Sequence, residues 1–214
     1  MSLTHAIGAG ADKIVGVIVR ALALARVHPN VLTLIGLLIN AAAAALLSTG
    51  LFFAAGFVIM TAAVFDMVDG RVARTTGRVT RFGGFLDSVL DRYSDLILLI
   101  GLLVYYASIN RFFYIVLTAV VMVASVLISY SRARAENVIP KCKVGFMERP
   151  ERIVLLIIGA LTNRMAPVLW VIAVLGNLTV LHRIIYTWQE TRRIEAEEAN
   201  VASAPELEKA NAIS

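Results

Sequence analysis

The chain has 214 residues, of which 59% are hydrophobic and only 16% charged, with a mean hydropathy of +0.79 and a formal net charge of +5. An average soluble domain is about half apolar and about a quarter charged, so the composition excludes an ordinary soluble protein and indicates one that lives in a lipid bilayer. The single cysteine, Cys142, excludes an intrachain disulfide. The basic residues form no run interleaved with aromatic residues, so no nucleic-acid partner is expected.

Residues 1–26 precede the first long apolar segment and are predicted to lie along the membrane surface. Lys13 and Arg20 interrupt their apolar stretch, which a cleaved signal peptide would keep unbroken. This mixture of apolar and basic residues is typical of an amphipathic helix at the membrane interface. We therefore expect a juxtamembrane surface helix and no secretory leader.

Residues 27–189 are predicted to form an all-α integral membrane domain with six transmembrane helices. Five of its apolar segments approach the roughly 20 residues that cross about 30 Å of hydrocarbon, and the fifth along the chain is shorter. Beyond Gln189 the chain is charged and rich in Ala and Glu, so residues 190–214 are predicted to be a mostly disordered tail. The six predicted spans cover residues 31–49, 51–72, 84–107, 112–133, 152–164 and 166–188.

The distribution of Lys and Arg predicts the orientation of these spans. Most basic residues lie in the N-terminal segment, between the second and third spans, between the fourth and fifth, and after the sixth. The opposite side holds only Arg111 and Arg164, and Arg92 lies within a span. Because cytoplasmic loops are enriched in Lys and Arg, both termini are predicted to face the cytoplasm. The protein is predicted to lie in the cytoplasmic (inner) membrane.

An acidic stretch joins the second and third spans. It reads "FDMVDGRVARTTGRVTRFGGFLDSVLDRYSD" and contains five aspartates, although an ionised Asp within a span costs roughly 2.5–3.5 kcal/mol. Asp66 and Asp69 are three residues apart, and Asp87 and Asp91 are four apart, so each pair shares one face of a helix. Consecutive spans are antiparallel, so the four carboxylates are predicted to converge at one end of two neighbouring helices.

Four converging carboxylates predict a metal site on the cytoplasmic side. Carboxylate oxygens suit hard cations such as Mg²⁺ and Mn²⁺, and two such ions about 3.5–4 Å apart promote displacement at phosphorus. Two divalent ions would also balance four negative charges. We therefore expect Asp66, Asp69, Asp87 and Asp91 to bind two divalent cations.

The residues around the aspartates indicate a ligand that contains phosphate. Gly70 has no side chain and lets a ligand approach the backbone, and Gly83 lies one turn before Asp87 and keeps that helical face open. Arg74 is placed to pair with phosphate oxygens. Asp95 extends the same face one turn further, and its spacing alone assigns it no function.

The spacing of these residues resembles the signature of the CDP-alcohol phosphotransferase (phosphatidyltransferase) family. The similarity covers about residues 10–190. It implies transfer of a phosphoryl-containing group from a CDP-linked donor to an alcohol, with release of CMP. It further implies that Asp66, Asp69 and Asp87 bind two divalent ions, and that Asp91 is the catalytic base, which also touches a metal. The matching pattern is Asp66-x-x-Asp69-Gly70-x-x-Ala73-Arg74, eight residues, then Gly83-x-x-x-Asp87-x-x-x-Asp91.

The resemblance also implies where the donor binds. The stretch "HPNVLTLIG" at residues 28–36 resembles the Pro-x-x-x-Thr pattern at the start of the family's first span. A homodimer is expected from the same resemblance. The residues implied for CDP binding are Pro29, Thr33, Asp69, Gly70, Ala73, Arg74 and Gly83.

Two further stretches resemble the branch of the family whose product is phosphatidylinositol phosphate: "ISYSRARAE" (128–136) and "VGFMERPERIV" (144–154). The implied donor is CDP-diacylglycerol, and the implied acceptor is inositol phosphate, a phosphorylated polar alcohol. Arginines at the cytoplasmic face suit an anionic acceptor, although a membrane boundary also selects for them. Glycerol 3-phosphate and serine are alternative acceptors, and a soluble CDP-linked alcohol is an alternative donor. The residues implied for the acceptor phosphate are Arg132, Arg149 or Arg152, and Arg183.

Two other classes of protein also use aspartates in a membrane. A cation transporter would place acidic residues near the mid-plane of several spans, whereas these cluster at one end of two spans beside arginines. A non-catalytic scaffold would not require matched helical spacing. The sequence therefore favours an enzyme of phospholipid synthesis.

Overall fold

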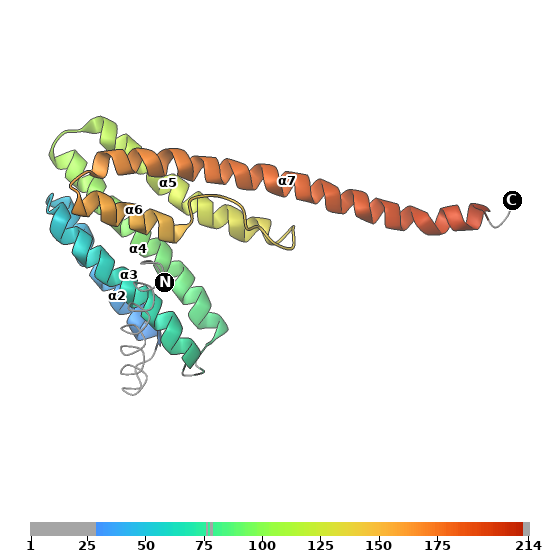
Figure 1. Cartoon of the computed structure of the whole chain (residues 1–214), viewed down its shortest axis with the longest axis horizontal. Helices are drawn as coiled ribbons and strands as arrows, with labels where there is room; N and C mark the ends of the chain where they lie inside the picture. Colours follow the sequence, from blue (N-terminus) through green and yellow to red (C-terminus); the bar gives the residue numbers. More distant parts are fainter. Residues whose placement is uncertain (1–28, 76, 78, 212–214) are drawn as a thin grey trace, which may run out of the picture.

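The computed structural model describes residues 29–75, 77 and 79–211, which fold into six α-helices and contain no β-strand (Figure 1). The all-α prediction is thus confirmed for the described part of the chain. The surface helix expected over residues 1–26 lies outside the described residues. The helices are α2 (Pro29–Ser48), α3 (Phe52–Thr75), α4 (Arg81–Ser108), α5 (Phe112–Ala135), α6 (Arg149–Leu161) and α7 (Met165–Asn211).

Four helical segments are long and apolar enough to cross a membrane. They are Asn30–Ser48, Phe52–Val72, Phe112–Ala135 and Met165–Ala199. Helix α4 has 28 residues but carries all its charges between Arg81 and Asp95, and α6 has only 13 residues, or about 20 Å of helix. The chain is therefore an integral membrane protein, while the predicted total of six spans stays a prediction.

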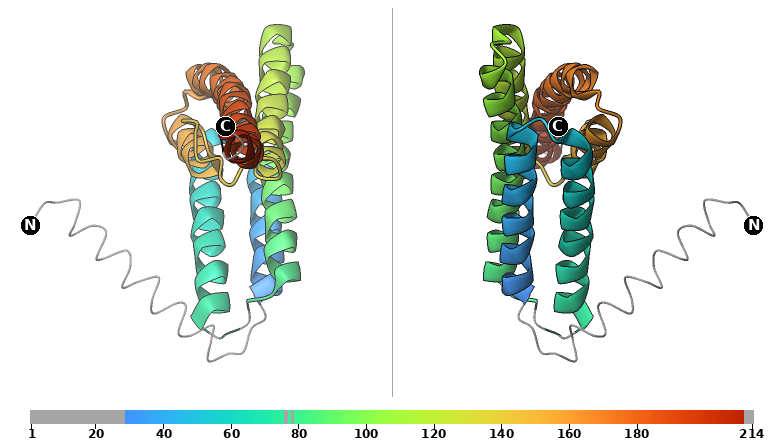
Figure 2. Two further views of the ribbon diagram at one scale, coloured as in Figure 1. Left: turned by 90° about the vertical axis from the view of Figure 1, so that its right-hand side faces the viewer. Right: turned by 90° about the vertical axis from the view of Figure 1, so that its left-hand side faces the viewer.

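The main packing contacts close the six helices into a ring. Helix α2 packs against α3 and α4, α5 packs against α4 and α7, and α6 packs against α3 and α7. Figure 2 shows α2, α3 and α4 standing upright beside one another, with the start of α7 across one end. Each helix thus has two neighbours, and residues far apart in the sequence face a common interior.

One end of the ring is filled by a continuous apolar core. All six helices contribute to it, for example through Leu47, Ile59, Leu102, Leu156 and Leu169, which are almost fully buried. Gly101 allows close approach of α4 to α2, because a Cβ there would lie 2.9 Å from the Ala44 Cα atom. In a bilayer, close packing of these side chains and the near approach of the backbones at Gly101 hold the helices together at this end.

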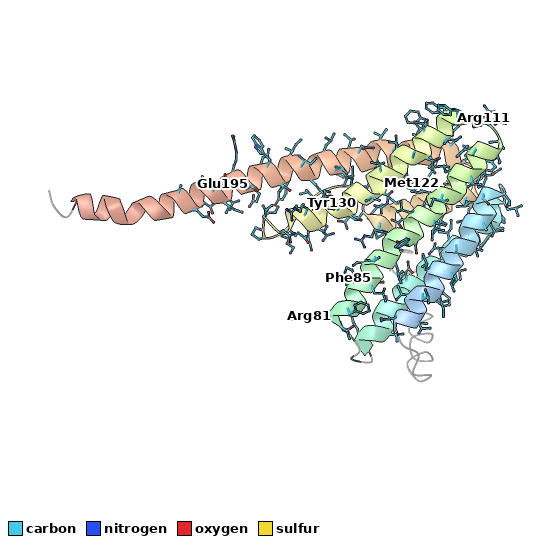
Figure 3. All side chains as sticks on the ribbon, turned by 180° about the vertical axis from the view of Figure 1, so that it is seen from behind. Arg81, Phe85, Arg111, Met122, Tyr130 and Glu195 are labelled. Carbon is cyan, nitrogen blue, oxygen red and sulfur yellow. The ribbon has the colours of Figure 1, made fainter. Side chains whose placement is uncertain are left out.

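At the other end, α4 and α5 diverge. Figure 3 labels Arg111, where the two helices join, and shows Phe85 on α4 and Tyr130 on α5 on separate arms. An apolar groove of about 520 Å³ lies in this fork, with both aromatic side chains in its wall. The charged residues predicted for the site lie in this less tightly packed half of the molecule.

The segment between α5 and α6 is fastened to α7. Thr179 Oγ1 accepts hydrogen bonds from the backbone N–H groups of Phe146 (3.2 Å) and Met147 (3.1 Å), and Arg183 Nε donates to the Val144 carbonyl at 2.9 Å. Cys142 is fully buried in this segment. These contacts set the place where α6 begins.

Helix α7 continues to Asn211 in place of the predicted disordered tail, and Figure 1 shows it running past the rest of the molecule. Its last part is rich in Ala and Glu, which are strong helix formers. Arg193 also pairs with Glu190 (3.7 Å) and Glu197 (3.0 Å) along the helix surface. At 1.5 Å per residue, its 47 residues make a helix about 70 Å long.

Candidate active site

The structure brings aspartates from α3 and α4 together inside the ring. Asp87, Asp91 and Asp95 lie at successive turns of α4, and the charges of Asp66, Asp87 and Asp95 all act on Asp91. Asp66 reaches this group from α3, and the side chains of Asp66 and Asp91 are 20% and 18% exposed. Asp69 lies in α3 one turn after Asp66, with a side chain outside the described part of the structure.

The guanidinium of Arg149 lies in the centre of these carboxylates. Its Nη2 is 2.7 Å from Asp66 Oδ2, its Nη1 is 2.9 Å from Asp91 Oδ1, and its Nε is 3.2 Å from Asp95 Oδ1. Arg149 is the first residue of α6, so the position of this helix places a cation among the acids. The sequence predicts Arg149 only as a candidate ligand of the acceptor.

The donor set fits a divalent cation. The described residues contain no group of three His, Cys, Asp or Glu close enough to hold a metal ion, and this search does not cover the Asp69 side chain. The carboxylate oxygens of Asp66 and Asp91 already converge on a cation, the Arg149 guanidinium. Oxygen ligands that surround a positive charge are what Mg²⁺ and Mn²⁺ require.

Helix α2 makes room for the Asp66 carboxylate. A Cβ atom on Gly36 would lie 2.9 Å from Asp66 Oδ1, so any larger residue would push the carboxylate away. Gly36 is not among the site residues predicted from the sequence. Gly36 is the last residue of the stretch "HPNVLTLIG" (28–36), which resembles the start of the family's first span, so the sequence offered a reason to consider it.

The residues predicted to bind CDP lie on three helices around the same acidic cluster. Gly83 is in the first turn of α4, and a Cβ there would lie 3.4 Å from Asn30 Oδ1 at the start of α2. Thr33 is buried one turn further along α2, whereas Arg74 is exposed in the last turn of α3. Gly70 precedes Arg74 by one turn, and its open face has the Arg74 guanidinium as nearest neighbour. Pro29 and Ala73 lie in α2 and α3, with side chains outside the described part.

A charged cavity of about 310 Å³ opens beside the aspartates. Asp91 and Asp95 line it together with Arg132, Arg149 and Arg183, three of the four arginines predicted for the acceptor phosphate; Arg152 does not line it. Equal numbers of acidic and basic side chains face it, so the cavity has no net formal charge. The charged residues of its wall are Arg92, Arg132, Arg149, Arg183, Asp91, Asp95, Glu136 and Glu148.

Glu148 joins two of these arginines. Its Oε1 is 2.9 Å from Arg132 Nη1 and 3.2 Å from Arg183 Nη2. Arg183 is 1% exposed and also donates to the carbonyls of Val144 and Ile128. A carboxylate of the protein thus occupies the position between Arg132 and Arg183, and the sequence analysis did not identify it.

Arg152 lies behind the cavity. It is 3% exposed, and its Nη2 is 2.5 Å from Asp95 Oδ2. Its guanidinium would reach the cavity only if the side chain turned away from Asp95. Asp95 therefore links Arg152 to Arg149, the residue that does line the cavity.

Comparison with known proteins places this geometry in a context. The sequence model of the CDP-alcohol phosphatidyltransferase family matches residues 26–191. The archaetidylinositol phosphate synthase of Methanothermobacter thermautotrophicus is 36% identical over 167 residues, which cover 75% of this chain and 83% of that protein.

The chain is also similar to solved structures of the phosphatidylinositol phosphate synthase of Mycobacterium tuberculosis. The structure with CDP-DAG bound has a TM-score of 0.76 at 32% identity, and the match covers 82% of this chain and 94% of the other. The structure in complex with manganese and citrate has a TM-score of 0.73 at 34% identity, with 80% and 87% covered.

Proposed function

Because the chain belongs to the CDP-alcohol phosphatidyltransferase family, we propose that it transfers a phosphatidyl group from CDP-diacylglycerol to inositol phosphate and releases CMP. The chain is an integral membrane transferase of phospholipid synthesis that uses divalent cations, Mg²⁺ or Mn²⁺, which confirms the resemblance seen in the sequence. The archaeal relative is named an archaetidylinositol phosphate synthase and the bacterial relatives are named phosphatidylinositol phosphate synthases. Both names contain inositol phosphate, and they differ in the lipid.

One observation carries the proposal for the acceptor. Carboxylates from α4 and arginines from α5, α6 and α7 line one cavity, and Arg149 in its wall also contacts the Asp66 carboxylate of α3. Carboxylates can hold the metal ions for a reaction at phosphorus, and arginines can bind the phosphate of the acceptor. A neutral acceptor would leave Arg132 and Arg183 without a substrate group to bind.

Asp66, Asp69, Asp87 and Asp91 would hold the cations. Bound there, two divalent ions would supply charge neutralisation for the diphosphate of the donor. The absence of a side chain at Gly36 leaves the space that the Asp66 carboxylate occupies. Pro29, Thr33, Gly70, Ala73, Arg74 and Gly83 would line the CDP moiety.

Asp91 would act as the general base. It lies in the wall of the cavity, where it can accept the proton of the acceptor hydroxyl. The acceptor oxygen then forms its bond to the phosphorus that carries the lipid, and the bond from that phosphorus to CMP breaks. Since an ionised Asp is a weak base, much of the rate must come from holding the hydroxyl against it.

Arg132, Arg149 and Arg183 would bind the phosphate of the acceptor, with Arg152 in support. The phosphate would take the place of the Glu148 carboxylate, which contacts Arg132 and Arg183. Exchange of one anion for another keeps both arginines paired. The approach of a charged acceptor therefore leaves no buried cation without a partner.

The arrangement in the membrane belongs to the same proposal. The site, both termini and the surface helix over residues 1–26 would lie on the cytoplasmic side of a six-span domain, because most Lys and Arg lie there. The active protein would be a homodimer. Reporter fusions at the termini and at the Arg111 turn would test the orientation, and crosslinking in native membranes would test the dimer.

The decisive experiment is an assay of purified protein with CDP-diacylglycerol and Mg²⁺ or Mn²⁺. Inositol phosphate, glycerol 3-phosphate, serine and inositol are offered in parallel, and CMP release is measured. We expect turnover with inositol phosphate, and we expect a metal chelator to stop it. Turnover with glycerol 3-phosphate alone would contradict the assignment of inositol phosphate as the acceptor, while the class of reaction would remain as proposed.

A further inference from the structure

Asp95 has a different charged partner on each of its carboxylate oxygens. Oδ1 is 3.2 Å from Arg149 Nε, and Oδ2 is 2.5 Å from Arg152 Nη2. The side chains of Asp95 and Arg152 are 7% and 4% exposed, whereas that of Arg149 is 24% exposed. The three residues thus form a line from the interior of the ring to the wall of the cavity.

This line crosses the interior of the ring. Asp95 lies on α4, and Arg149 and Arg152 lie one turn apart on α6, two helices that are not neighbours in the ring. The Asp95 carboxylate therefore contacts both arginines of the first turn of α6, whereas Asp91, also on α4, contacts only Arg149. The start of α6 is also where the chain arrives from the segment fastened to α7.

Stability alone does not explain an ion pair in this place. Asp95 and Arg152 share a small void with Leu99, Leu156 and Ile172, at the edge of the apolar core. An ion pair buried among such residues is often no more stabilising than apolar side chains of similar size. What apolar residues cannot do is fix the orientation of the Arg149 guanidinium.

The contact with Arg149 Nε is suited to that task. Asp66 and Asp91 contact the two terminal nitrogens. Asp66 is assigned above to the cations, and Asp91 to the cations and to the acceptor proton. Asp95 is not one of the four aspartates proposed to hold the cations. Its contact with Nε can therefore persist while the other two carboxylates engage substrate and metal.

We propose that Asp95 is a positioning residue which, anchored by buried Arg152, holds the Arg149 guanidinium at the cavity wall for the phosphate of the acceptor. The proposal rests on the proposed function, since it requires an anionic acceptor in that cavity. It deepens that function because acceptor binding then depends on a residue outside the family's aspartate pattern. Asp95 acts through Arg149 and takes no part in the chemistry.

Asp95→Asn tests this directly, because the amide keeps the shape and removes the charge. We expect the KM for inositol phosphate to rise by about tenfold, as a charged hydrogen bond to an arginine is lost. The KM for CDP-diacylglycerol should change by less than about twofold. Ser94→Ala is the matched control, since Ser94 is the buried polar neighbour on the same helix, and both KM values should stay at the wild-type level. Equal rises in both KM values for Asp95→Asn would overturn the proposal.

A double-mutant cycle separates positioning from general stability. Inositol phosphate binding is measured by calorimetry on detergent-solubilised protein, so that inactive variants remain informative. If Asp95 acts through Arg149, Asp95→Asn weakens binding in the wild type and has no further effect in an Arg149→Gln background. Additive losses would overturn the proposal. Should Asp95→Asn fail to fold, Asp95→Glu replaces it in the same cycle, with a smaller expected loss.

The wild-type assay distinguishes this proposal from the proposed function. If the wild-type enzyme uses another phosphorylated acceptor, the proposed function fails in its acceptor, and the KM comparison is made with that acceptor. If the wild-type enzyme uses only a neutral acceptor, positioning of Arg149 for a phosphate is overturned as well.

Discussion

The two halves of α4 differ in what they do with the same helical geometry. The half that begins at Arg81 carries aspartates at successive turns and faces a cavity lined with charges, whereas the half that ends at Ser108 packs one face into the apolar core. In the second half packing is dense, and Gly101 leaves no space for a methyl group. In the first half, side chains are held by charge and hydrogen bonding. Substitutions in the two halves should therefore affect different measurements.

The largest effect is expected in the polar half, at Asp91. Asp91→Asn removes the general base, and CMP release should fall by roughly 10²–10⁴-fold. The thermal unfolding temperature should stay near that of the wild type, because the amide keeps the shape of the side chain. Full transferase activity in this variant would show that Asp91 is not the base.

The apolar half should respond in stability. Gly101→Val places side-chain atoms against the Ala44 backbone, and such overpacking costs about 1–3 kcal/mol or more. The unfolding temperature in detergent should fall, while the KM values of the folded fraction stay unchanged. Gly84→Ala is the control on the same helix, because a Cβ at Gly84 meets nothing within 4 Å. A changed KM with an unchanged unfolding temperature would contradict the expectation that the apolar half acts on stability alone.

Gly36→Ala should disturb the polar half from a neighbouring helix. The added methyl would lie 2.9 Å from Asp66 Oδ1, and displacement of this carboxylate should weaken Mn²⁺ binding by about tenfold, or ~1.4 kcal/mol. Electron paramagnetic resonance of free Mn²⁺ measures this without turnover. Ala42→Ser, at an exposed position of α2, should bind Mn²⁺ like the wild type. Unchanged Mn²⁺ affinity in Gly36→Ala would remove Asp66 from the metal site.

The smallest effect is expected at Glu148. Its carboxylate competes with an incoming phosphate for Arg132 and Arg183, and Glu148→Gln should lower the KM for inositol phosphate by about threefold, as expected for a partly exposed ion pair. Glu136→Gln is the control, because Glu136 contacts only Arg132 among these arginines, at 3.2 Å, and should have a weaker effect. A higher KM in Glu148→Gln would mean that the carboxylate helps to hold the acceptor.

The sequence predicted what is local. Apolar runs placed the helices, and the four-residue spacing of Asp87 and Asp91 placed them at successive turns of α4. The family was also predicted correctly, because its signature lies within one short stretch. Each of these features depends on residues close together in the chain.

What the sequence did not predict depends on contacts over long separations. Arg149 reaches Asp66 and Asp91 because the segment before α6 is fastened to Thr179 and Arg183, more than thirty residues further along the chain. No spacing rule encodes such docking. The helical end of α7 was missed for a different reason, since charged Ala- and Glu-rich sequence suits both a disordered tail and a solvated helix.

The burial of Cys142 simplifies site-directed labelling of this protein. Its thiol is fully buried and packs with Val144 and with Tyr186 in the middle of α7, so a maleimide reagent has no access to it in the folded protein. A cysteine introduced at an exposed position will therefore be labelled alone, without a prior cysteine-free background. Spin labels or fluorophores placed in this way on the start of α6 and on α4 can report the distance between these helices as substrates bind.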